Sequence, residues 1–187
     1  MLRTVKLLTR GKMARVSLVE KEQADPIMRD IYQRLEDQHM PILNLFKVMG
    51  NCPYIGRNFI RLGSSILREE ELSPKLRELA ILRVGYLAQA EYEFTKHVVI
   101  GQEAGVTKEQ IGVIPEWATS TRFNDEERAI LRYTDEVAQN IRVEDNTFAE
   151  LRNFLNEPAI VKLTTTIGYY GMACRIMVAL QIELEAE

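Results

Sequence analysis

The sequence predicts an all-α protein that folds as a single-domain helical bundle of about seven or eight helices. Signals for helix starts recur along the chain, whereas the alternation of apolar and polar residues that is typical of strands is almost absent. Hydrophobic residues make up 46% of the 187 positions, which is enough for one domain with a sizeable core. The connections between the helix signals are short, as in a bundle.

In the N-terminal half, the predicted helices begin at prolines. Proline suits the first helical position because it has no backbone N–H to leave unpaired. Asp25 and Ser73 precede two of these prolines, and their side-chain oxygens are good N-caps. The predicted ranges are Pro26 to about Gln38, a short helix within Pro41–Met49, Pro53 through Ile66, and Pro74 to about Leu87.

In the C-terminal half, capping residues mark the helix starts. The pairs Thr107–Gln110 and Asn124–Glu127 have the spacing of capping boxes. Gly105 is expected to end the preceding helix in the left-handed conformation. The other predicted ranges are Ala90–Ala104, Asp145 to about Leu155, and a long helix from Pro158.

The net charge of −3 is distributed unevenly. Residues 1–12 contain four basic residues and no acid, and the other 20 basic and 27 acidic residues give residues 13–187 a net charge of −7. Such a body repels nucleic-acid phosphates, so nucleic acid is not an expected partner. We interpret residues 1–12 as an N-terminal extension ahead of Met13, with a targeting peptide as the alternative, and residues 13–187 as the helical domain.

Two further features concern membrane and redox compartment. The apolar stretch 159–182 is long enough to span a membrane, but Lys162 and Arg175 interrupt it, which predicts a buried helix and no membrane partner.

Cys52 and Cys174 lie far apart in the sequence and form no CxxC pair. Two free thiols in a reducing cytoplasm are therefore expected.

Three ionisable residues lie on apolar faces of two successive predicted helices. Glu78 shares its face with Ile81 and Leu82, where an unpaired charge would be costly to bury. Glu93 and His97 are four residues apart on the next helix and are therefore neighbours on one face.

A break near Ala88–Gln89 would fold the two helices together and bring Glu78, Glu93 and His97 to one pocket. Neither Arg77 nor Arg83, which flank Glu78 in the sequence, is expected on the same helix face. The alternative interpretation is that each of the three is a core residue with a satisfied partner.

The run from Leu72 to Val84 (LSPKLRELAILRV) resembles the signature helix of the carboxymuconolactone decarboxylase family, and the similarity continues through residues 90–97 and 103–107. In the alkylhydroperoxidase D branch of this family, a Glu precedes a CxxC pair and then a His. Those positions here are Glu78, Ala90, Glu93 and His97. The resemblance implies the alkylhydroperoxidase D-like helical fold and a site at these residues.

The departure from the family pattern is at both cysteine positions. Ala90 and Glu93 can form neither a thiolate nor a disulfide. Peroxide reduction through a CxxC pair requires a nucleophilic thiolate and the formation of a disulfide. The sequence therefore predicts a branch without thiol-dependent peroxidase activity.

The remaining residues favour acid/base chemistry. A buried Glu has a raised pKa, and His97 beside Glu93 can exchange protons near neutral pH. With the resemblance, this predicts a cofactor-free lyase, a decarboxylase or related isomerase, that acts on a small organic acid or lactone. Glu78, Glu93 and His97 are the expected catalytic residues, and Tyr86, Tyr92 and Arg83 the expected substrate-binding residues.

Two alternatives stay open: a divergent alkylhydroperoxidase-like protein, and a noncatalytic small-molecule-binding or assembly protein. No bound metal is expected, because the chain has only two histidines and His39 lies at a predicted helix end.

A homo-oligomer (dimer, trimer or hexamer) is expected. The last helix carries apolar residues on several faces, and Gly168 and Gly171 would let another helix approach closely. The apolar residues named for assembly are Ile167, Tyr169, Tyr170, Met172, Ile176, Met177 and Leu180. Seven methionines and the apolar segment Ile42–Met49 add adaptable contact surface.

Overall fold

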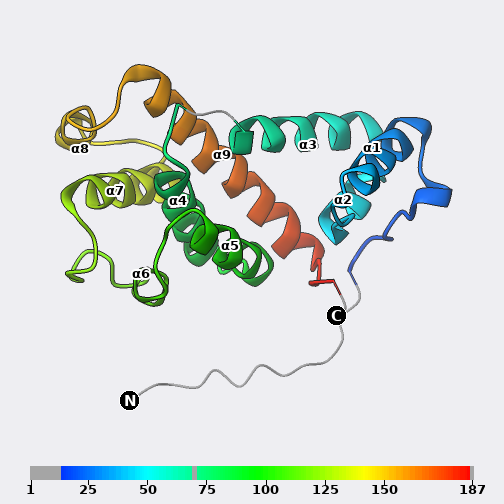
Figure 1. The fold of residues 1–187 in the computed structure, drawn as a ribbon, viewed down its shortest axis with the longest axis horizontal. Helices are drawn as coiled ribbons and strands as arrows, with labels where there is room; N and C mark the ends of the chain where they lie inside the picture. Colours follow the sequence, from blue (N-terminus) through cyan, green and yellow to red (C-terminus); the bar gives the residue numbers. More distant parts are fainter. Residues whose placement is uncertain (1–13, 69–70, 186–187) are drawn as a thin grey trace, which may run out of the picture.

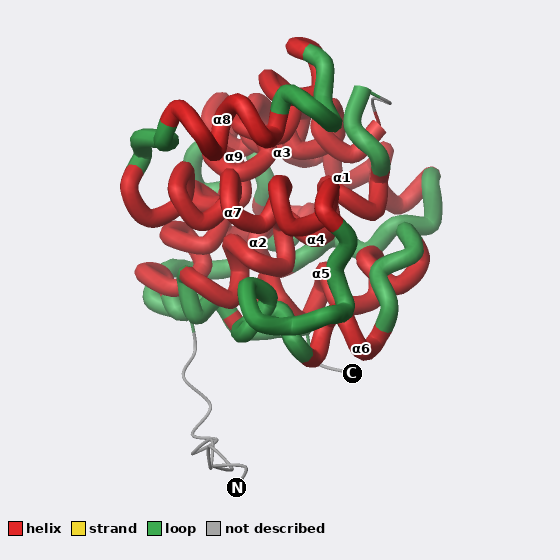
Figure 2. Tube along the Cα trace, turned by 90° about the vertical axis from the view of Figure 1, so that its left-hand side faces the viewer, coloured by secondary structure: helices red, strands yellow, loops and turns green. Residues whose placement is uncertain are grey.

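The computed structural model describes residues 14–68 and 71–185. These residues form helices and loops, without a strand (Figure 2). The predicted all-α fold is therefore confirmed, whereas the expected extension at residues 1–12 lies outside the described residues. The α-helices are α1 Pro26–Asp37, α2 Asn44–Met49, α3 Pro53–Arg68, α4 Pro74–Leu87, α5 Glu91–Glu103, α6 Lys108–Gly112, α7 Asp125–Asn140, α8 Asp145–Leu151 and α9 Glu157–Leu180, and a 3-10 turn spans Lys21–Gln23.

The helix ends mostly follow the expected chemistry. Both predicted capping boxes form, at Thr107 and at Asn124, and Gly105 is left-handed with φ +95°. The described residues contain nine α-helices where about seven or eight were expected, because each capping box begins a helix of its own, α6 and α7. In helix α8, Glu144 rather than Asp145 occupies the N-cap position, without a side-chain capping bond, and the helix ends at Leu151, about one turn earlier than expected.

Helix α4 lies at the centre of the bundle. Its ten residues from Leu76 to Gly85 are all buried, and it packs against α5, α7 and α9. Helix α9 crosses the molecule between α1–α3 on one side and α4–α8 on the other (Figure 1). Among residues 14–68 and 71–185, no helix combines the length and apolarity that a membrane span requires.

Candidate active site

Helices α4 and α5 form a tight antiparallel pair that positions the predicted site. Gln89, with φ +51°, reverses the chain between them, at the break expected near Ala88–Gln89. The pair packs closely because of glycine: a Cβ at Gly101 would come 3.2 Å from Leu82 Cδ1 and 3.7 Å from Glu78 Cβ. The close packing turns the inward faces of the two helices toward each other, and these faces carry Glu78, Glu93 and His97.

Glu78, His97 and Glu93 form one hydrogen-bonded array, named here the acid–histidine cluster. His97 Nδ1 is 2.6 Å from Glu78 Oε2, and His97 Nε2 is 3.0 Å from Glu93 Oε1. All three residues are buried, with exposed fractions of 0% for Glu78, 5% for Glu93 and 6% for His97. The expected convergence of the three residues is therefore what the structure contains.

Arg77 completes the cluster, although helix geometry placed it on another face. Its Nε donates to Glu78 Oε1 at 3.0 Å, and its Nη1 donates to the Leu67 carbonyl at the end of α3 at 3.2 Å. Adjacent residues of a helix point in different directions, but an arginine side chain is long enough to fold back along its helix. The Arg77 guanidinium therefore still reaches the Glu78 carboxylate. Both oxygens of Glu78 thus have a partner, and such charge-assisted hydrogen bonds are among the strong ones.

The two carboxylates control the protonation of His97. Burial lowers its pKa by disfavouring the charged form, but the hydrogen bonds and negative charges of Glu78 and Glu93 outweigh this and raise the pKa to about 9. His97 is therefore an imidazolium at neutral pH, with both ring N–H groups donating to carboxylates. With Arg77, the interior then holds two positive and two negative charges.

Aromatic residues of α9 form the wall beside the cluster, and they are not among the site residues predicted from the sequence. The Tyr170 ring contacts the His97 ring edge-on, with centroids 4.9 Å apart, and Tyr169 packs against Tyr170 and against Phe59 of α3. Gly63 makes room for this stack, since a Cβ there would lie 2.4 Å from the Tyr169 hydroxyl. The adjacent tyrosines in an apolar helix were the available signal, but they were interpreted as an assembly surface.

Burial and the charge of Glu93 raise the pKa of both α9 tyrosines above the ordinary value of 10, and Glu78 adds to this effect at Tyr170. Both phenols are therefore protonated hydrogen-bond donors over the whole physiological pH range. Neither hydroxyl donates to another described residue. The wall of the cluster thus holds two donors suited to a substrate oxygen.

The three expected substrate-binding residues lie in other surroundings. Arg83 forms an ion pair with Asp135 of α7, at 2.6 Å from Nε to Oδ1, and does not contact the cluster. Tyr86 is partly exposed, with the Arg83 guanidinium over its ring. Tyr92 is buried, and its hydroxyl donates to Glu185 of the C-terminal segment, which with burial raises the Tyr92 pKa.

The cysteines are free thiols in different environments. Cys52 is exposed, and Cys174 is buried in α9. Burial, followed by the charge of Glu93, raises the pKa of the Cys174 thiol to about 12, so its thiolate is scarce at neutral pH. Among the described residues, no group of three or more His, Cys, Asp or Glu side chains is arranged to hold a metal ion.

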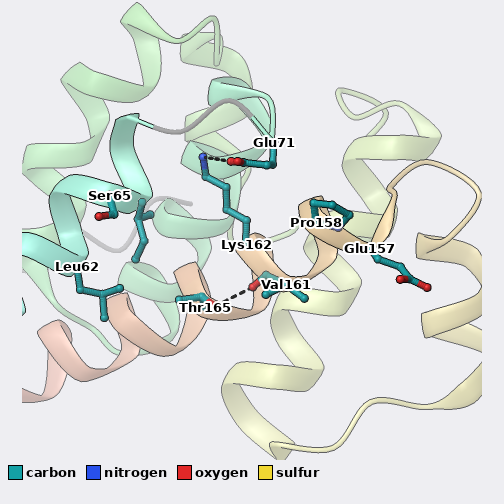
Figure 3. Close-up of a pocket in the computed structure, with 9 residues that line it drawn as sticks. Leu62, Ser65, Glu71, Glu157, Pro158, Val161, Lys162 and Thr165 are labelled. Carbon is teal, nitrogen blue, oxygen red and sulfur yellow. Dashed lines mark hydrogen bonds and ion pairs between the residues drawn. The ribbon is translucent and has the colours of Figure 1, made fainter.

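Two clefts lie beside α9, and none of the three residues of the acid–histidine cluster lines either. The first, named here the α3/α9 cleft, has a volume of about 520 Å³, and Lys162 forms an ion pair with Glu71 at its edge (Figure 3). The second, the α4/α7/α9 cleft, has a volume of about 680 Å³. The α3/α9 cleft is lined by Leu62, Ser65, Ile66, Glu71, Glu157, Pro158, Val161, Lys162 and Thr165.

Comparison with protein families supports the interpretation of α4 and α5. The profile of the carboxymuconolactone decarboxylase family matches residues 53–136, from the start of α3 into α7. The resemblance to this family is confirmed. The matched segment contains Glu78, Glu93 and His97. The sequence has no significant match among curated proteins.

Several solved structures share the fold. The alkylhydroperoxidase AhpD core of an uncharacterized peroxidase-related protein from Ralstonia eutropha JMP134 superposes with a TM-score of 0.81 at 15% identity, over 94% of each chain. A peroxidase-related protein from Silicibacter sp. TM1040 gives 0.78 at 15% identity, over 96% of each chain. A cysteine-to-alanine variant of the debrominase Bmp8, in complex with 2,3,4-tribromopyrrole, gives 0.72 at 21% identity, over 95% of this chain and 94% of that one. These likenesses show the alkylhydroperoxidase D-like fold.

Proposed function

We propose that the protein is a cofactor-free acid/base enzyme that moves a proton in a decarboxylation, or in a related lyase or isomerase step, of a small organic acid or lactone. The observation that carries this proposal is the acid–histidine cluster, in which both nitrogens of one buried imidazole contact carboxylates. Such an array stores a proton in surroundings from which water is largely excluded. Its groups are those that general acid/base catalysis uses.

Within the cluster, Glu93 is the residue we assign to proton exchange with the substrate. Its Oε1 contacts His97, whereas its Oε2 has no hydrogen-bond partner among the described residues. Glu78 is a positioning residue, because Arg77 and His97 occupy both of its oxygens. His97 links the two carboxylates and replenishes the proton at Glu93.

A decarboxylation at this site has a simple balance. The bond between the carboxylate carbon and its neighbour breaks, CO2 leaves, and the electron pair passes to an adjacent carbonyl as an enolate. The His97 imidazolium passes its Nε2 proton to the Glu93 carboxylate, and Glu93 delivers that proton to the carbon to form the new C–H bond. Tyr169 and Tyr170 can donate hydrogen bonds to the enolate oxygen. Solvent reprotonates the imidazole, so one proton is consumed for each CO2 released.

A thiol peroxidase reaction is not favoured by any feature of the site. Ala90 and Glu93 occupy the two cysteine positions of the family motif, and the raised pKa of Cys174 opposes thiolate formation. A noncatalytic small-molecule-binding or assembly protein is the second candidate. Its supporting observation is the near-complete burial of the acid–histidine cluster, which would also suit a purely structural ion network.

The test uses a panel of lactones and aromatic-degradation acids. Compounds that raise the melting temperature of the protein are then incubated with it in D2O, and CO2 release and deuterium incorporation are followed by NMR. We expect His97→Gln to lower turnover by at least about 100-fold, the usual contribution of a general acid or base. The matched control is His39→Asn, which changes the other histidine at an exposed position with φ +55°, a conformation that asparagine tolerates.

Two outcomes would overturn the proposal. Turnover that is unchanged in the His97→Gln variant would remove the cluster from the reaction. Stabilising compounds that bind without deuterium incorporation or CO2 release would establish the noncatalytic alternative.

We also propose that the chain assembles with copies of itself, and the surface that supports this differs from the one expected. Four of the α9 residues named for assembly are buried within the single chain: Ile167, Tyr169, Tyr170 and Met177. Helix α3 instead exposes Ile55 and Leu62, seven residues apart on one face, and Leu62 lines the α3/α9 cleft together with the exposed Val161 of α9 (Figure 3). Light scattering tests this: a mass near 21.6 kDa that is unchanged on dilution would contradict assembly, whereas Ile55→Glu should lower a larger mass.

A further inference from the structure

The α4/α7/α9 cleft has the size and composition of a small-molecule site. Its volume of about 680 Å³ lies within the range of roughly 300–1,000 Å³ that is typical of ligand pockets. The walls are mainly aliphatic. They comprise Val84, Leu87 and Ala88 of α4, Val137, Ala138, Gln139 and Ile141 at the end of α7, and Ile167, Gly168, Gly171, Cys174, Arg175, Val178 and Ala179 of α9.

Two glycines shape the α9 side of this cleft. A Cβ at Gly168 would meet no atom within 4 Å, so the helix backbone there borders open space. A Cβ at Gly171 would come 3.1 Å from Arg175 Nη1, so the absence of a side chain lets the guanidinium fold along the helix. Glycine thus both widens the cleft and permits the position of Arg175.

Arg175 is the only charged residue among those that line the cleft. Its Nη1 donates to the Gly171 carbonyl at 2.8 Å, and no carboxylate of residues 14–68 or 71–185 forms an ion pair with it. In the α3/α9 cleft, by contrast, the cation Lys162 faces the carboxylate of Glu71 (Figure 3). The cation of the α3/α9 cleft is therefore paired with a carboxylate of the same cleft, whereas the α4/α7/α9 cleft presents a fixed positive charge next to aliphatic walls.

Ile141, at the rim of the cleft, supplies an independent observation. It has φ +66°, a conformation that is a genuine outlier for a β-branched residue, and 87% of its surface is exposed. Backbone strain of this kind is costly and concentrates at binding and switch sites. A large apolar side chain held in water in a strained conformation can gain contacts when a ligand fills the adjacent cleft.

We propose that the α4/α7/α9 cleft binds a small carboxylate with an aliphatic or aromatic body. The Arg175 guanidinium receives the carboxylate through paired N–H donors, and the aliphatic walls of α4 and α9 cover the apolar body. Ile141 closes over the bound molecule from the rim. This site is separate from the acid–histidine cluster, so the inference does not rest on the proposed function.

The experiment is isothermal titration calorimetry of the full chain with octanoate and with octan-1-ol, which share the apolar chain and differ in charge. We expect octanoate to bind at least about tenfold more tightly than octan-1-ol. Arg175→Gln should remove this difference by weakening octanoate alone, and Gly168→Leu should weaken both ligands by filling the cleft. Arg61→Gln, which changes an exposed arginine of α3, is the matched control and should change neither affinity.

Three results would overturn the inference. One is no binding of octanoate, and another is equal affinity for the two ligands. The third is a light-scattering mass of two or more chains that falls to the monomer in an Ile141→Ser variant, because a second copy would then occupy the cleft.

Discussion

Helix α4 contributes to two buried polar clusters, and they differ in how completely their hydrogen bonds are used. In the acid–histidine cluster, Glu78 contacts the His97 imidazole, which also contacts Glu93, a carboxylate with a spare oxygen. Five residues along the helix, Arg83 belongs to a second group, named here the arginine–aspartate cluster. Its Nε and Nη2 donate to the two oxygens of Asp135, and its Nη1 donates to the Ile114 and Pro115 carbonyls. Trp117 Nε1 also donates to Asp135, at 3.0 Å.

This difference in hydrogen bonding indicates that the arginine–aspartate cluster is structural, whereas the acid–histidine cluster can react. A guanidinium keeps its charge at all relevant pH values, and in the arginine–aspartate cluster its hydrogen bonds tie the loop before α7 to α4 and α7. The imidazolium of the acid–histidine cluster instead has a pKa of about 9 and can lose its proton in a mildly alkaline solution. A buried polar group is thus a better indicator of chemistry when it can change charge and when one of its neighbours has a free acceptor.

The largest expected effect on the free energy of unfolding comes from a change in the arginine–aspartate cluster. Arg83→Met should lower the free energy of unfolding by about 3–5 kcal/mol, because it leaves Asp135 and two carbonyls without their main donor. Chemical denaturation measures this, with the exposed Arg142→Met as the matched control, which should stay within about 0.5 kcal/mol of the parent. A loss for Arg83→Met no larger than for the control would show that the network does not stabilise the fold.

The acid–histidine cluster should make stability depend on pH. The folded pKa of His97, about 9, exceeds its unfolded value of about 6.5, so its stabilisation is complete below pH 6.5 and is lost as pH rises through 9. The change is on the order of 3 kcal/mol at most. His97→Gln should flatten the unfolding free energy between these pH values, and His39→Asn should leave it unchanged. Parallel pH profiles for the parent and His97→Gln would contradict the assignment.

A smaller effect is expected when one hydrogen bond of the arginine–aspartate cluster is removed. Trp117→Phe keeps an aromatic ring but loses the donor to Asp135, at a cost of about 1–2 kcal/mol, including a small packing change. Because no titrating group near neutrality is involved, this loss should be the same at pH 6.5 and pH 9. Denaturation at both pH values is the measurement, and a pH-dependent loss would show that the two clusters are coupled.

No effect is expected from the cysteines on any peroxide turnover. The Cys52→Ser, Cys174→Ser double variant should consume hydrogen peroxide or an organic hydroperoxide at the same background rate as the parent protein. The motif positions hold Ala90 and Glu93, and the thiol of Cys174 is protonated at neutral pH. Peroxide turnover that disappears in the double variant would establish a thiol mechanism.

Most of the fold could be predicted from local chemistry. Proline starts, two capping boxes and Gly105 fix helix ends through contacts within a few residues, and these features are present in the structure. Both ends of α8 were predicted less well, since Glu144 and not Asp145 occupies the N-cap position and the helix ends at Leu151. The acid–histidine cluster could also be predicted from the sequence, because all three residues interrupt apolar faces of one helix pair.

The remaining parts of the site depend on contacts between distant segments. The position of Tyr170 beside His97 is fixed by the packing of α9 on α5, which helical periodicity does not reveal. Arg77 reaches Glu78 through the flexibility of its side chain, and Arg83 is bound by an aspartate 52 positions away. For such long polar side chains, the helix face does not determine the partner.

The most direct test of the charged acid–histidine cluster is an NMR titration of the His97 ring nitrogens in the His39→Asn variant, which leaves a single imidazole in the chain. We predict that both nitrogens carry protons at pH 7 and that the ring titrates with a midpoint near pH 9, as its two carboxylate partners require. A neutral imidazole at pH 7, with a titration midpoint at or below the ordinary histidine value of about 6.5, would show that the two carboxylates do not hold His97 as an imidazolium.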